Sequence, residues 1–108
     1  MRKAILLICL FLFPITPSYS ESLSDLEHAV SKRAEDNPAS AYEYFLEQIE
    51  TGADPEEQAV YLYGMGLARE HQDNFGEAVN DYLAAEALGN KSAIHALKRL
   101  QKQLKRGK

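Results

Sequence analysis

Residues 73–89, DNFGEAVNDYLAAEALG, align without a gap with residues 36–52, DNPASAYEYFLEQIETG. The offset of 37 residues falls among the periods of roughly 20 to 50 residues that are typical of stacked helical repeats. The shared positions suit a helix cap, a small inward residue, an aromatic anchor and a terminal glycine, although chance similarity between two helices is the alternative. The aligned pairs are Asp36/Asp73, Asn37/Asn74, Ala41/Ala78, Phe45/Tyr82, Leu46/Leu83 and Gly52/Gly89.

Start and stop signals for helices bracket both copies. Asn37 precedes Pro38, a favoured first helical residue, and Gly52 ends that helix at a position that tolerates positive φ. Asn74 and Gly89 bracket the second copy in the same way. We therefore predict one helix in each copy.

Three further helices are predicted. Asp54-Pro55-Glu56-Glu57 is a capping box and predicts a helix over 55–71, whose apolar character on every side indicates a central position. Ser24 and Glu27 form a similar box before a short first helix, and a last helix begins near residues 90–92. The predicted fold is all-α, a short solenoid of antiparallel helix hairpins. The inward positions are Leu26, Ala29 and Val30 in the first helix and Ile94, Leu97, Leu100 and Leu104 in the last.

The stretch 59–93 resembles a tetratricopeptide-type repeat, and more particularly the Sel1-like variety, whose second helix ends in a signature similar to Tyr82–Asn90, YLAAEALGN. The resemblance implies a weaker repeat over about residues 22–52, a better one over about 54–89 and a basic capping helix over about 91–106. It also implies small residues where two helices approach closely, and an aromatic anchor between them. These repeat positions are Gly66, Ala78, Tyr82, Ala85 and Gly89, with Leu62 and Met65 as packing positions.

Two departures from that pattern affect the prediction. Arg69 stands where the tetratricopeptide pattern usually has an aromatic residue. In the weaker copy, Asp25, His28 and Lys32 fall on positions that should pack. We therefore expect the first helix to pack in another register.

Residues 1–20 predict a cleavable export signal. Two cations precede an apolar run over residues 4–13, and Ser18 and Ser20 supply the small residues that signal peptidase needs. The run is shorter than the roughly 20 residues that span a bilayer, and a retained membrane anchor is the alternative. We expect cleavage after Ser20, which removes Cys9, the only cysteine, and export to the periplasm or beyond the cell.

Charge is divided unevenly along the chain. Residues 21–90 carry 3 Lys or Arg against 16 Asp or Glu, whereas residues 91–108 carry 7 against none. The basic helix suits a solvated cap, and the alternatives are an anionic membrane surface or the acidic body of a neighbouring copy. No nucleic acid partner is expected, because the basic segment has no aromatic residue. The basic surface comprises Lys98, Arg99, Lys102, Lys105 and Arg106.

No motif for catalysis or cofactor binding occurs in the sequence. His28, His71 and His95 are dispersed, and none forms a two-histidine pair with ligand spacing. A P-loop, a dinucleotide fingerprint and a nucleophile elbow are all absent from the sequence. We expect neither enzyme activity nor a bound metal or cofactor.

The resemblance implies a binding face on the first helix of each hairpin, which lines the concave surface of such arrays and binds a peptide of another protein. We therefore expect an exported protein-interaction module. One alternative is a membrane-surface protein held by the basic last helix, and another is a homodimer that buries this face. The first helix could also simply cover Val60, Tyr63 and Leu67. The predicted partner-binding residues are Val60, Tyr63, Leu67, Glu70 and His71.

Overall fold

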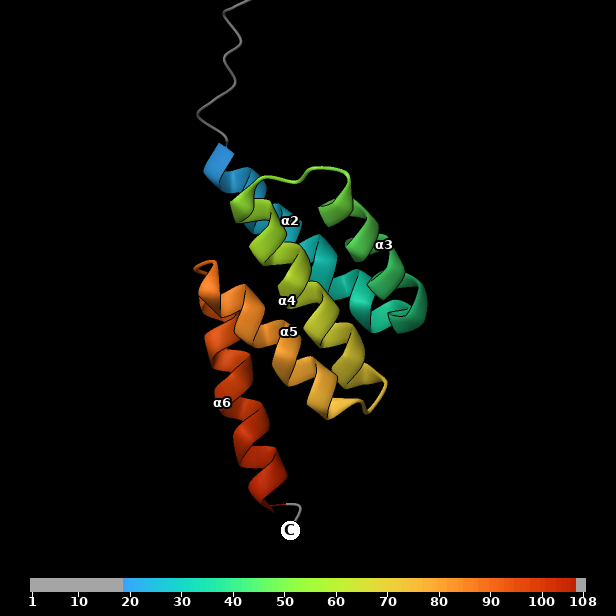
Figure 1. Ribbon diagram of the computed structural model, residues 1–108, viewed down its shortest axis with the longest axis vertical. Coiled ribbons are helices and arrows are strands. Elements are labelled where there is room, and N and C mark those ends of the chain that lie inside the picture. Colours follow the sequence, from blue (N-terminus) through green and yellow to red (C-terminus); the bar gives the residue numbers. More distant parts are fainter. Residues whose placement is uncertain (1–18, 107–108) are drawn as a thin grey trace, which may run out of the picture.

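The computed structural model describes residues 19–106, and it describes individual side chains from residue 23 onward. This part of the chain contains five α-helices and no strand, which confirms the all-α class. Short turns join the helices, and neighbouring helices run antiparallel (Figure 1). The predicted export signal lies outside the described residues, apart from residues 19 and 20. The helices are α2 (Tyr19–Asp36), α3 (Pro38–Glu50), α4 (Pro55–His71), α5 (Phe75–Ala87) and α6 (Lys91–Arg106).

Helix α4 is the central element, as its all-round apolar character predicts. It packs against α2, α3 and α5, while α6 packs on α5. Two glycines make this possible. A Cβ atom at Gly64 would overlap Val30 and Phe45, and a Cβ atom at Gly66 would overlap the ring of Tyr82. Each glycine therefore lets one aromatic anchor approach the α4 backbone.

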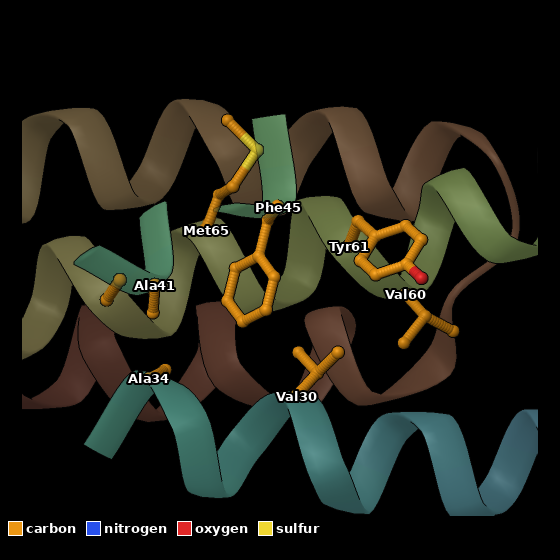
Figure 2. Close-up of a cluster of buried hydrophobic side chains, with 8 residues drawn as sticks. Val30, Ala34, Ala41, Phe45, Val60, Tyr61 and Met65 are labelled. Atoms are coloured by element: carbon orange, nitrogen blue, oxygen red, sulfur yellow. The ribbon is translucent and has the colours of Figure 1, made fainter. Parts of the chain in front are cut away.

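Two apolar clusters lie on either side of α4. One gathers around Phe45, which Figure 2 shows between Val30 and Met65. The other gathers around Tyr82 and joins α5 to α6 through Ala85 and Leu100. Phe45 and Tyr82 are both fully buried, so each cluster is built on one anchor.

The aligned positions of the two copies have matching environments. Ala41 and Ala78 are both buried, and so are Phe45 and Tyr82. The matched leucines, in contrast, are both exposed, Leu46 by 38% and Leu83 by 49%. The two terminal glycines adopt positive φ, 109° at Gly52 and 97° at Gly89. The alignment thus pairs residues that occupy equivalent places in the two hairpins.

Some predicted caps form and others do not. Asp54 Oδ1 accepts a hydrogen bond from the Glu57 backbone N–H at 3.1 Å, and Asn37 Oδ1 a longer one from that of Ser40 at 3.5 Å. Asn74 precedes α5, but its side chain makes no capping hydrogen bond within the described range. The sharp turn before α5 is instead made by Asp73, whose φ is +62°.

The prediction that Ser24 caps the first helix was wrong, because α2 begins at Tyr19 and Ser24 lies inside it. Glu27, the predicted partner of Ser24 in this cap, instead binds residues at the start of α6. Its carboxylate accepts hydrogen bonds from Asn90 Nδ2 at 3.2 Å and from Ser92 Oγ at 3.0 Å. Asn90 Oδ1 in turn accepts from the backbone N–H of Ala93 at 2.8 Å, which caps α6. The start of α6 is thereby tied to α2.

The first helix does pack in another register. Asp25, His28 and Lys32 are all exposed, whereas Val30 and Ala34 are buried. Ala29, predicted to face inward, is exposed, because the buried line turns toward Leu23, Leu26, Val30 and Ala34 instead.

The inward face of α6 differs in part from the prediction. Ala93, Ala96 and Leu100 are buried, and Leu97 packs beside them. Leu104 is 43% exposed, because the end of α6 extends past the turn between α4 and α5 (Figure 1). No helix between residues 19 and 106 is long and apolar enough to cross a membrane.

Candidate functional site

A groove of about 400 Å³ opens where the end of α4, the beginning of α5 and the middle of α6 meet. It brings together three of the five predicted partner-binding residues, Leu67, Glu70 and His71, with Arg99 of the predicted basic surface. Its walls combine apolar, charged and amide groups. The lining residues are Leu67, Glu70, His71, Asp73, Phe75, Arg99 and Gln103.

An ion pair fixes one wall of this groove. Arg99 of α6 binds the Glu70 carboxylate of α4 with both terminal nitrogens, Nη1 to Oε2 and Nη2 to Oε1 at 3.2 Å. The hydroxyl of Tyr82 donates to Glu70 Oε1 at 2.6 Å. A bidentate arginine and a buried phenol restrict the carboxylate to one position, so three helices are held together at this point.

The interactions of this network favour a charged Glu70, a charged Arg99 and a neutral Tyr82. Burial opposes ionisation of Glu70, but the hydrogen bonds from Arg99 and Tyr82 outweigh it and hold the pKa of Glu70 below its usual value. Burial and the neighbouring Glu70 carboxylate raise the pKa of Tyr82, so its phenol remains a neutral donor. The hydrogen bond to Glu70 also raises the pKa of Arg99. At neutral pH the wall therefore presents a salt bridge that is already formed.

The remaining two predicted binding residues lie elsewhere. Val60 is only 5% exposed, belongs to the core between α2, α3 and α4, and does not line this groove. Tyr63 is half-buried, with its ring centroid 6.0 Å from that of Tyr82. Burial, and then the charge of Glu27 on α2, raise the pKa of Tyr63. Val60 thus belongs to the first apolar cluster and Tyr63 packs against the second, and neither residue lines this groove.

Several groove residues were not predicted from the sequence. Asp73, Phe75 and Gln103 join the site only because the α4–α5 turn and α6 converge on the end of α4. Arg99 was expected on an outward basic face, but it turns back to Glu70, 29 residues away in the chain. The positions of Asp73 and Phe75 next to the second start signal were the one sequence clue.

Arg69 occupies the place where the repeat pattern expects an aromatic residue, and it stacks on one instead. Its guanidinium carbon lies 3.8 Å from the ring centroid of Tyr42, and its Nη2 lies 3.1 Å from Glu77 Oε1. This joins α3, α4 and α5. Among the described residues, Arg69 Nε and Asp81 Oδ2 are buried without a hydrogen-bond partner. Burial raises the pKa of Asp81 to about 6, with the charge of Arg69 opposing this rise and that of Glu77 adding to it.

The other residues of the predicted basic surface are exposed along α6. Within the described part of the chain, Lys98, Lys102, Lys105 and Arg106 form no ion pair. Between residues 19 and 106, no group of three or more His, Cys, Asp or Glu side chains is placed to hold a metal ion.

A comparison with models of known protein families gives no match, and neither do comparisons with curated proteins and with solved structures.

Proposed function

We propose that the protein is an exported interaction module that binds a peptide, or an extended segment of another protein, in the groove between α4, α5 and α6. The observation that carries the proposal is the joining of two apolar side chains, Leu67 and Phe75, with the prearranged Glu70–Arg99 pair. A site whose polar groups are already fixed loses little entropy when a partner binds.

The surroundings of the groove favour a polypeptide ligand. His71 and Asp73 are exposed at one end, and Gln103 supplies an amide on α6. A peptide offers both apolar side chains and backbone amides, which suit this mixture of apolar and polar groups. The resemblance of the chain to tetratricopeptide-type repeats supports the same class of ligand.

Two of the exposed histidines, His71 and His95, provide a matched test. His71 lines the groove, whereas His95 lies on α6 and does not. A photo-crosslinking amino acid placed at position 71 should capture a discrete partner in cells, and the same group at position 95 should not. Equal products from both positions, or none from position 71, would argue against the groove as the binding site.

Export is a separate part of the proposal. Leu23 packs against the core. Cleavage after Ser20 would leave Leu23 and its contacts in the mature chain. N-terminal sequencing of the protein from fractionated cells should give a chain that begins at Glu21 outside the cytoplasm. A chain that keeps Met1 and stays in the cytoplasm would contradict export, but it would not bear on the proposed binding site.

A further inference from the structure

Helix α6 carries a stripe of lysines that the molecule itself leaves unpaired. Lys98, Lys102 and Lys105 follow the spacing i, i+4, i+7, which places them on one helix face over about 10 Å. All three are exposed, and none forms an ion pair within residues 19–106. Neighbouring Arg99 points to Glu70 and is not part of this lysine stripe.

Helix α3 carries a stripe of opposite charge with the same spacing. Glu43, Glu47 and Glu50 are also at i, i+4, i+7, and all three are exposed and without an ion pair in the described range. They are the only charged residues of α3. Helix α6 contains no acidic residue, and its ionisable side chains are lysines, arginines and one histidine. This glutamate stripe borders a hollow of about 550 Å³ on α3.

Exposed apolar side chains accompany the glutamate stripe. Leu46 and Tyr44 are 38% and 37% exposed beside the glutamates. On α6, Leu104 is 43% exposed but lies about 100° around the helix from Lys105, on the side of Leu97 and Leu100, so it is not part of the lysine stripe. A charged stripe with an adjacent leucine is a more specific surface than charge alone, because apolar contact adds to an attraction that water weakens.

The two stripes cannot meet within one molecule. Helices α4 and α5 lie between α3 and α6 (Figure 1). Water solvates both stripes in the single molecule, and a second copy of the chain offers each a partner of opposite charge with the same spacing.

We propose that the lysine stripe of one copy docks on the glutamate stripe of a second copy. The contact is between different surfaces, so two copies can pair reciprocally through two such contacts, or copies can continue head to tail. It uses no residue of the peptide groove. Self-association and peptide binding are therefore separable properties.

Charge exchange between the stripes tests this proposal. We consider the full chain with K98E/K102E/K105E, which makes both stripes acidic, and with E43K/E47K/E50K, which makes both basic. Sedimentation velocity at low salt should show association of the unaltered protein, weakened by high salt. Each triple variant alone should associate at least about tenfold more weakly, because like charges then face each other.

Mixing the two triple variants should restore association, and so should combining all six substitutions in one chain. Because the substituted side chains are exposed, circular dichroism should show unchanged folding. The proposal is overturned if the unaltered protein stays monomeric at low salt, or if the mixture associates no better than either variant alone. Monomeric protein whose lysine stripe instead binds vesicles containing anionic lipid would equally overturn it. These outcomes leave crosslinking from position 71 unaffected.

Discussion

The ring of Tyr82 lies directly against Gly66, and no other residue type leaves room for it. A Cβ atom at position 66 would overlap the Cε1 and Cδ1 atoms of the ring. Tyr82 is fully buried, and its hydroxyl donates a hydrogen bond to Glu70, which is four residues after Gly66 in α4. The close approach of α5 to α4 thereby sets the position of the ion pair that forms the groove wall.

Replacing this glycine should destabilise the fold. Gly66→Ala forces the Tyr82 ring away from α4, and overpacking of this kind costs about 1–3 kcal/mol. Gly76→Ala is the matched control, because its Cβ would meet nothing within 4 Å, and it should be neutral or stabilise the helix by up to about 1 kcal/mol. Urea unfolding followed by circular dichroism measures both. Equal effects of the two substitutions would contradict the close approach.

The hydroxyl of Tyr82 should contribute separately from its ring. Tyr82→Phe keeps the packing but removes the hydrogen bond to the Glu70 carboxylate, and bonds to charged groups are worth about 1.5–3 kcal/mol. Tyr44→Phe is a suitable control, because Tyr44 is 37% exposed and its loss of a hydroxyl should change stability by less than about 0.5 kcal/mol. If both variants unfold at the same urea concentration, the network does not hold the helices together.

Asp81 should make stability fall as pH rises from about 4 to about 6. Its pKa is raised from 3.8 to about 6 in the folded protein, so the folded state binds a proton more tightly than the unfolded state. Stability therefore decreases as pH rises through this window, because a buried carboxylate becomes charged. Glu70 acts oppositely: its lowered pKa adds stability above its unfolded value of 4.5, which is lost as pH falls below it.

Asp81→Asn separates these contributions. The variant should lose the decline in melting temperature between about pH 4 and pH 6 that the wild type shows, while the loss at lower pH remains. Melting curves at intervals of pH provide the comparison. Parallel profiles for the two proteins would mean that Asp81 is not desolvated as the structure shows.

Local features of the fold were predictable from the sequence. Gly52 and Gly89 adopt the positive φ that a glycine at the end of a helix predicts. The cap at Asp54 involves only residues within one helical turn, so it could be recognised from local sequence. The anchors Phe45 and Tyr82 were identified because a repeated spacing placed them beside small residues. Such signals are contained in short stretches, so five helices and their order could be derived.

Contacts between distant residues could not be predicted in this way. Glu27 was interpreted as part of a local cap, but it binds Asn90 and Ser92 across the array. Arg99 was assigned to a solvated face, although Glu70 lies within its reach once α6 packs on α5. The periodicity of a helix shows which residues share a face, but not which neighbour that face meets.

The two glutamines of α6 allow the most direct test of the proposed binding site. Gln103 lines the groove, whereas Gln101, two residues earlier and exposed, points to another side of the same helix. A photo-crosslinking amino acid at position 103 should capture the same partner as one at position 71, and the group at position 101 should not. A partner captured equally from 101 and 103, or from neither, would show that the groove between α4, α5 and α6 is not where this protein binds.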